Sequence, residues 1–289
     1  MVLVEPFELC IAIGETAVGL RCVDEEFAHL LCTWCGKFES TRTPDFWLEV
    51  GLKEGRTAAE IQQIMPELQL LVGGESFYSH PPLLEGEVSL TEHWLKFRAE
   101  KALFHSDIQP RFLNVLLSSI YNTICEHQLA NERAAFLFHG CGVIAQDRGY
   151  LFTGPSGAGK TTVARLSGER TVLNDETVLL RLSEEGVLME GTPLLGGVNK
   201  RHAGQVQLQA IFVLEQGLEV GVRQLKIMDA FQRVLCQLFE PSPIFPSTVE
   251  KPHLLKQQMD FTADILSRVP AYVLTFRPDD SFWPLVEAL

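Results

Sequence analysis

The chain lacks several features that would assign it at once to a broad class of protein. None of its 289 residues form an apolar run of the roughly 18–20 residues that a membrane-spanning helix needs. The first residues show neither the basic stretch nor the clean apolar run of a secretory signal. Internal repeats and low-complexity tracts are also missing. We therefore expect a globular protein of the cytoplasm, with one large or two modest domains.

An excess of positive charge is missing too. Lys and Arg together number 24 against 37 Asp and Glu, so the formal net charge is −13. An acidic surface argues against non-specific binding to nucleic acids or anionic membranes. We therefore expect neither as a partner, while a local basic pocket for phosphate stays compatible with this composition.

The cysteines do not form a metal or disulfide framework. There are seven, an odd number, and Cys32 and Cys35 have the spacing of a redox or zinc pair. A second Cys or His pair at metal-ligand spacing is missing, so a zinc site would lack half its ligands. Thr33 and Trp34 between them do not resemble a thioredoxin motif. Core or surface thiols in a reducing compartment are the favoured interpretation over a redox or metal function.

The first hundred residues are expected to form an N-terminal α+β region without recognisable chemistry. Apolar and β-rich segments predict strands, and a helical stretch follows the second of them. The predicted strands are 9–13, 17–22, 46–51 and 87–90, the helix is 25–38, and the turns are 73–74 and 81–82. We take residues 1–100 as this region and 101–289 as a second domain.

Strands and helices alternate in the second domain, which predicts an α/β (α+β) core that is mainly β around one glycine loop, with flanking helices. Apolar residues at three- and four-residue intervals predict an amphipathic helix over 111–130. The predicted strands are 134–138, 143–145, 150–153, 171–173, 177–182, 209–215 and 271–276. The other predicted helices are 161–166, 229–239, 256–269 and 281–289, and the turns are 147–149 and 241–246.

The glycine loop fits the phosphate-loop pattern G-x-x-x-x-G-K-S/T. Its residues are Gly154, Pro155, Ser156, Gly157, Ala158, Gly159, Lys160 and Thr161, with Thr162 next. Glycines let backbone N–H groups turn toward a phosphate, and the helix N-terminus that follows adds a positive end. Lys160 can reach the β- and γ-phosphates and Thr161 can bind Mg²⁺. We therefore predict binding of ATP with Mg²⁺, against the alternative of a chance glycine turn before a helix.

An acidic pair, Asp175 and Glu176, follows 15 residues after Lys160. The spacing leaves room for one short helix and one strand, so Asp175 is expected on the strand adjacent to the loop. A triphosphate site needs an acidic group for its metal, and a kinase needs a base near the acceptor hydroxyl. We predict Thr161 and Asp175 as metal-binding residues, against the alternative of a solvated turn.

A histidine, His139, precedes Gly154 by 15 residues, at the end of the predicted strand 134–138. A hairpin through 147–149 would return it to the loop, where it could contact the γ-phosphate or tune the base. On spacing alone, a histidine satisfied by backbone at a strand end is the favoured interpretation.

These stretches together resemble the HPr kinase/phosphorylase family and its looser HPr-kinase-like relatives. The matching stretches are 138–143, 149–162 and 173–176, and 191–197 with 209–216 resemble the looser relatives. The resemblance covers roughly residues 130–220 and implies a phosphate-loop core similar to that of ATP-dependent phosphoenolpyruvate carboxykinases. It also implies that His139 assists near the γ-phosphate. Asp175 would then be the base or the metal-linked acid, with Glu176 beside it.

The sequence departs from true HPr kinases because no stretch matches their Arg-Gly-Leu-Gly signature. HPr as acceptor, phosphorolysis and a hexamer are therefore not expected, although a homo-oligomer stays open. The leading hypothesis is an ATP-dependent kinase acting on a peptide or protein Ser or Thr, or on a small-molecule hydroxyl. The alternative is a nucleotide-binding regulatory protein or an ATPase partner of another enzyme. Residues 191–197 are either a turn or the border of the acceptor pocket, and Lys200, Arg201 and His202 are more simply solvated surface.

Overall fold

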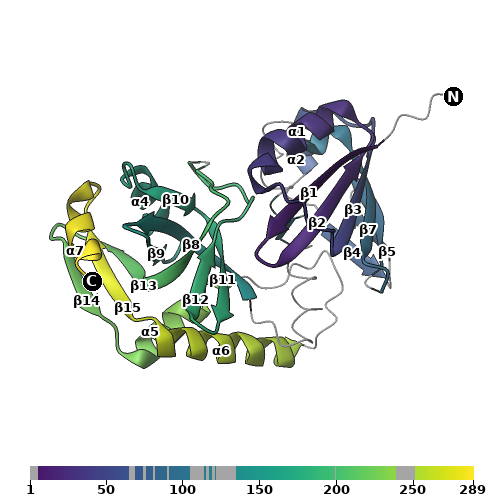
Figure 1. Ribbon diagram of the computed structural model, residues 1–289. Coiled ribbons are helices and arrows are strands. Elements are labelled where there is room, and N and C mark those ends of the chain that lie inside the picture. The colour runs from purple at the N-terminus through teal and green to yellow at the C-terminus, as the bar shows by residue number, and fades with distance from the viewer. Residues whose placement is uncertain are drawn as a thin grey trace. The chain divides into compact units, whose positions relative to one another are not determined.

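The computed structural model describes residues 6–64, 69–73, 76–80, 82–89, 91–104, 114, 117–118, 121, 135–198, 200–238 and 251–289. The chain forms two compact units, residues 1–128 with 241–248 and residues 129–240 with 249–289. Each unit contains its own sheet, together with helices (Figure 1). This mixed architecture confirms the predicted α/β class. The predicted helix over 111–130 and turn over 241–246 lie almost wholly outside the described residues.

The first unit contains a seven-stranded mixed sheet in the order β1-β2-β3-β7-β6-β5-β4. Its strands are β1 (Phe7–Ile13), β2 (Thr16–Cys22), β3 (Phe46–Lys53), β4 (Gln69–Gly73), β5 (Ser76–His80), β6 (Leu84–Ser89) and β7 (Trp94–Glu100). Its helices are α1 (Glu25–Cys35) and α2 (Ala58–Ile64), with short 3₁₀ turns η1 (Gly36–Phe38) and η3 (Lys101–Phe104). Strands β2, β3 and β7 run parallel, and the other pairs are antiparallel.

The four strands and the helix predicted for this unit are confirmed, whereas α2, β4, β5 and β7 were not predicted. Strand β7 carried a usable signal, because Leu95, Phe97 and Ala99 alternate with charged residues and are buried, while Lys96 and Arg98 are exposed. Such period-2 alternation is typical of a sheet with one solvated face.

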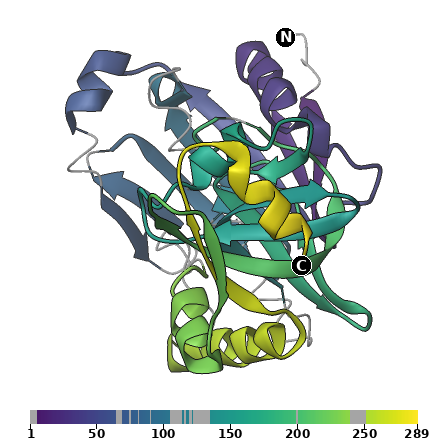
Figure 2. The ribbon, with the colours of Figure 1, turned by 90° about the vertical axis from the view of Figure 1, so that its left-hand side faces the viewer.

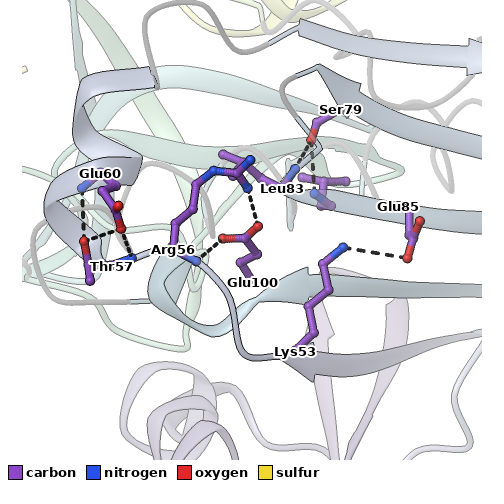
Figure 3. Close-up of polar contacts among 9 residues, drawn as sticks. Lys53, Arg56, Thr57, Glu60, Ser79, Leu83, Glu85 and Glu100 are labelled. Carbon is purple, nitrogen blue, oxygen red and sulfur yellow. Dashed lines mark hydrogen bonds and ion pairs between the residues drawn. The ribbon is translucent and has the colours of Figure 1, made fainter.

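Polar side chains fix the start of α2 and the end of β7 (Figure 3). Thr57 and Glu60 form a capping box, in which Glu60 Oε2 accepts from Thr57 N at 2.8 Å and Thr57 Oγ1 accepts from Glu60 N at 3.4 Å. Glu100 is buried and accepts from Arg56 N at 2.7 Å and from the Arg56 guanidinium. Gly55 fits here because a Cβ would lie 2.5 Å from the Glu100 carboxylate.

The second unit contains an eight-stranded sheet in the order β10-β8-β11-β12-β13-β15-β14, with β9 pairing β8 and β13. Its strands are β8 (Ala135–Ala145), β9 (Arg148–Thr153), β10 (Thr171–Asn174), β11 (Thr177–Ser183), β12 (Gly186–Glu190), β13 (Gln205–Gln216), β14 (Gly221–Gln224) and β15 (Ala271–Phe276). Strand β8 changes partner midway, since 135–139 pair β11 and 140–145 pair β9. Strand β8 therefore links the two: its first part pairs with the start of β11, and its second part forms the hairpin with β9.

Helices cover the second sheet in two groups (Figures 1 and 2). Along β9, Leu151 belongs to the core that includes α5 (Ile227–Leu235) and α6 (Lys251–Arg268). Its neighbours Tyr150 and Phe152 belong to the core that includes α4 (Lys160–Arg165) and α7 (Trp283–Glu287), which follows the 3₁₀ turn η4 (Asp280–Phe282). A strand buried on both faces reads as a continuous apolar run, which is why 150–153 was recognisable.

The predicted strands and turn around β8 need correction. The strands predicted at 134–138 and 143–145 are one strand, β8, and the turn lies at Gln146 and Asp147 rather than at 147–149. Both turn residues have positive φ, 51° and 60°, as a two-residue type I′ hairpin loop requires. Strands β12 and β14 were not predicted. The remaining predicted strands and helices are present within a few residues, and no described helix is long and apolar enough to cross a membrane.

Candidate functional site

The glycine loop joins the end of β9 to the start of α4 and depends on three glycines. Gly154, Gly157 and Gly159 have φ values of 149°, 82° and 115°, which residues with a Cβ rarely adopt. A Cβ at Gly159 would also lie 2.6 Å from Phe276 Cζ, and one at Gly154 would lie 2.9 Å from Ala158 Cβ. The backbone of the loop is therefore possible only for glycine at these positions.

Lys160 begins α4 and folds back over the loop. Its side chain is buried, and Nζ donates to the carbonyl oxygens of Gly154 at 2.9 Å and Pro155 at 3.3 Å. Burial lowers the pKa of Lys160, and the negative charge of Glu176 opposes part of that shift. Because α4 has only six residues, its dipole is small. Lys160 thus places a buried cation directly on the loop.

The tip of the loop is held by a residue that no sequence pattern singled out. Gln216, the last residue of β13, donates from Nε2 to Gly157 O at 2.8 Å. No local pattern could have predicted this contact, because 59 residues separate the two partners. Thr161 and Thr162 follow Lys160 in α4 and are both partly buried.

Asn174 shapes the turn that carries the acidic pair. Its Oδ1 accepts from Glu176 N at 2.8 Å and from Thr177 N at 2.9 Å. The turn links β10 to β11, and β8 lies between β10 and the loop strand β9. The prediction that Asp175 lies on the strand adjacent to the loop is therefore wrong. The pairing of β10 with β8 is a long-range event that sequence spacing does not determine.

Asp175 is fully buried, at 0% exposure. Its Oδ2 accepts from Val198 N at 2.9 Å, whereas Oδ1 is buried and has no hydrogen-bond partner among the described residues. Burial raises the pKa of Asp175, and the neighbouring charge of Glu176 raises it further. A buried carboxylate oxygen without a donor is costly, and it is an oxygen ligand of the kind that Mg²⁺ prefers.

Glu176 and His139 form a pair, with His139 Nε2 and Glu176 Oε1 3.0 Å apart. The side chains are 41% and 27% exposed respectively, so both can be reached from solvent. The hydrogen bond from His139 holds the pKa of Glu176 below its usual range, and the charges of His139 and Lys160 lower it further. The sequence suggested that His139 ends a strand, and this prediction is wrong. It lies within β8 at the change of partner, opposite Thr177.

The loop and the acidic turn meet at Gly197. A Cβ there would lie 3.2 Å from Thr161 Oγ1 and 3.6 Å from Asp175 Oδ2. The Thr161 hydroxyl and the Asp175 carboxylate therefore approach the same glycine from the two halves of the site. Among the basic residues that follow, Lys200 Nζ donates to Ala164 O at 3.2 Å and Arg201 Nη1 to Pro193 O at 2.8 Å.

The donor set does not form a preformed metal cage. Within the described ranges, no group of three or more His, Cys, Asp or Glu residues is arranged to hold a metal ion. That limit fits Mg²⁺, which is commonly bound through one or two carboxylates together with substrate phosphates. Cys32 is exposed and Cys35 is buried, and neither takes part in a disulfide.

Comparisons with known proteins add little to this geometry. No protein-family model matches the chain, and no curated protein matches it in sequence. Among solved structures, the chain is similar to the HPr(Ser) kinase/phosphatase from Coxiella burnetii, with 12% sequence identity and a TM-score of 0.30. The match covers 53% of this chain and 92% of that one. A likeness this weak supports no functional inference.

Proposed function

We propose that the second unit is a phosphotransferase that moves the γ-phosphoryl group of Mg²⁺-bound ATP to a hydroxyl group. The observation that carries the proposal is the approach of Thr161 and Asp175 to the same glycine, Gly197, one from each half of the site. A phosphate loop alone is compatible with many activities. A loop threonine and a buried, incompletely bonded carboxylate at one point are what a metal–triphosphate site requires.

The residues present fit ATP and Mg²⁺. The three positive-φ glycines keep side chains off the loop backbone, so its N–H groups can approach phosphate oxygens closely. Lys160 would hold the β- and γ-phosphates, and Thr161 and Asp175 would hold Mg²⁺. When bound, ATP supplies the phosphoryl group and Mg²⁺ neutralises charge on its phosphates. The unpartnered Oδ1 of Asp175 is the atom that most clearly calls for a cation.

Exposure separates the roles of the two acids. Asp175 is fully buried, whereas Glu176 is 41% exposed and hydrogen-bonded to His139. A base must reach the proton that it removes. We therefore assign Asp175 to the metal and Glu176 to the acceptor hydroxyl, with His139 orienting the Glu176 carboxylate. Lys160 would stabilise the charge that develops on the transferring group.

We propose the chemical class of the acceptor, a hydroxyl group, and not the molecule that carries it. A half-exposed carboxylate and histidine can serve a serine or threonine of a peptide or protein, and equally a small-molecule hydroxyl. The assay would therefore supply both kinds of acceptor together with ATP labelled at the γ-phosphate. Label that remains on ATP or appears only as inorganic phosphate, from protein that binds ATP, would favour the regulatory or ATPase alternative.

Binding is tested first, by thermal unfolding with and without Mg²⁺ and ATP. A ligand present at 100 times its Kd stabilises the folded state by about 2.7 kcal/mol, and Lys160→Ala should remove most of that gain. Lys226→Ala is the matched control, because Lys226 is an exposed lysine of the same unit at the start of α5. An equal shift in Lys160→Ala and wild type would mean that the loop is not the site.

A further inference from the structure

The segment 191–198, which follows β12, covers the acidic turn. Its first half is anchored at several points. Asn174 Nδ2 donates to Leu194 O at 2.7 Å and to Thr192 O at 3.1 Å, and Arg201 bonds to Pro193 O. Gly191, Thr192, Pro193 and Leu194 are all buried. This half is therefore a fixed part of the wall of the site.

The second half differs. Gly197 is exposed, and Gly196 and Val198 are only partly buried. The hydrogen bond from Val198 N to Asp175 Oδ2 ties this half to the acidic turn. The Val198 side chain also packs against the core that includes α4 and α7, so this half is held at Val198 as well as through Asp175. The backbone at Gly196 and Gly197 can shift without breaking the anchored half of the segment.

Both oxygens of the Asp175 carboxylate are covered by these residues. Oδ2 is bonded to Val198 N, and a Cβ on Gly196 would lie 2.1 Å from Oδ1. Only a glycine can pack so closely on the carboxylate. Because these residues pack closely on both oxygens, a cation that binds Asp175 would compete with the backbone of 196–198 for the carboxylate.

We infer that Gly196–Val198 is a gate over Asp175, which packs on the carboxylate in this structure and is displaced when a divalent cation binds. This inference rests on the proposed function, since it assigns the cation to Asp175. The closed gate compensates one carboxylate oxygen with a backbone N–H until the cation takes that place. The closed gate also weakens the apparent affinity for the cation, because only the molecules with an open gate can bind. The apparent Kd is the intrinsic Kd divided by the open fraction.

Gly196→Ala tests the gate directly, because the added methyl group cannot coexist with the closed position. The φ of Gly196 lies outside the left-handed region, so alanine adds no backbone strain there. Mn²⁺ binding, followed by electron paramagnetic resonance of the free ion, is the readout. If the gate is closed about ten times more often than open, the variant should bind Mn²⁺ about tenfold more tightly. Gly221→Ala is the control, since a Cβ there meets nothing within 4 Å.

Unchanged or weaker Mn²⁺ binding by folded Gly196→Ala would overturn the gate. If that variant does not fold, hydrogen exchange of wild-type protein decides. Saturating Mn²⁺ should speed exchange of the Val198 amide, because it loses its carboxylate acceptor, and slower exchange there would refute the idea. Failure of the proposed function looks different: ATP with Mg²⁺ would not stabilise wild type, whatever Gly196→Ala does to Mn²⁺ binding.

Discussion

Glu100 in the first unit and Asp175 in the second are both buried carboxylates, and their oxygens are satisfied very differently. Glu100 in the first unit receives the backbone N–H of Arg56 on one oxygen and its guanidinium on the other (Figure 3). Asp175 in the second unit receives a backbone N–H on one oxygen, and its other oxygen has no donor in the described part of the chain. Burial alone therefore does not mark a functional acid. The oxygen without a donor is the observation on which the proposed role of Asp175 rests.

The same contrast holds for the charges on the first sheet. Its groove of about 810 Å³ is lined by Arg21, Glu49, Glu85 and Lys96, among others. These charges have partners at hand: Lys96 lies 3.4 Å from Glu49, and Arg21 lies 2.7 Å from a carboxylate of β1. The second unit also contains internal ion pairs, such as Arg181 with Glu190 at 2.8 Å, so Asp175 differs from the paired charges of both units. The following predictions would break or sharpen that contrast, in order of expected effect.

Glu176→Gln should reduce phosphoryl transfer by roughly 10²–10⁴-fold, the usual loss when a general base is removed. Stabilisation by Mg²⁺ and ATP should largely survive, because the metal is assigned to Asp175. Transfer of labelled γ-phosphate and thermal unfolding measure the two effects on one sample. Glu219→Gln, at an exposed site in the same unit, should match wild type. If Glu176→Gln instead lost the stabilisation by ligand and kept transfer, the roles of the two acids would be reversed.

Glu100→Gln should destabilise the first unit by about 2–3 kcal/mol, because it leaves the Arg56 guanidinium without its charged partner. The lower end is favoured since Arg56 is 37% exposed and water can screen it. Chemical denaturation measures the loss. Glu85→Gln breaks the exposed pair with Lys53 at 3.7 Å and should cost no more than about 0.5 kcal/mol. Equal effects of the two variants would contradict a structural role for Glu100.

Asp175→Asn should stabilise the metal-free second unit by about 1 kcal/mol at pH 7, while weakening the stabilisation by Mg²⁺ and ATP. Burial raises the folded pKa of Asp175 above its unfolded value near 3.8. Ionisation of Asp175 therefore destabilises the folded state increasingly as the pH rises from the unfolded pKa to the folded pKa. Above the folded pKa this destabilisation is complete. The gain from asparagine should accordingly vanish as the pH falls toward 3.8. Denaturation at several pH values tests this, and a loss of stability at pH 7 would contradict it.

Thr57→Ala should cost about 1 kcal/mol, because it removes the side-chain half of the capping box at the start of α2. The loss should appear in chemical denaturation of the first unit and leave ligand-induced stabilisation of the second unchanged. Thr33→Ala is the comparison, since the Thr33 hydroxyl donates to the His29 carbonyl within α1 and caps no helix N-terminus in the described part of the chain. Equal losses from the two substitutions would mean that the cap contributes nothing special.

The sequence was most informative where one short segment determines its own structure. The glycine loop was predicted residue by residue, because its pattern needs positive-φ glycines between an apolar strand and a helix. Residues 150–153 of strand β9 were recognisable from their apolar content, and helices α5 and α6 were predicted within a few residues of their observed bounds. The short, partly polar strands β12 and β14 carry too few apolar residues to stand out.

Long-range contacts set the limit of prediction within the site. Gln216 reaches the loop tip, and Gly196 packs on Asp175, across separations that no local pattern reports. The place of β10 beside β8 rather than β9 likewise depends on which strands meet in the folded sheet. The sequence suggested where the chemistry lies, and the fold was needed to show which acid is covered and which is open.

Strand β8 is expected to make the two halves of the site unfold cooperatively. Its first five residues pair with β11, at whose start the acidic turn ends, and its remaining six pair with β9, which leads into the glycine loop. Unzipping either partner exposes the same strand, so partial opening of one half should propagate to the other. Amides of β8 should therefore exchange with solvent only when the whole unit unfolds. We therefore expect the glycine loop and the acidic turn to unfold as one cooperative unit. The proposed gate, Gly196–Val198, is then the part of the site that can open alone.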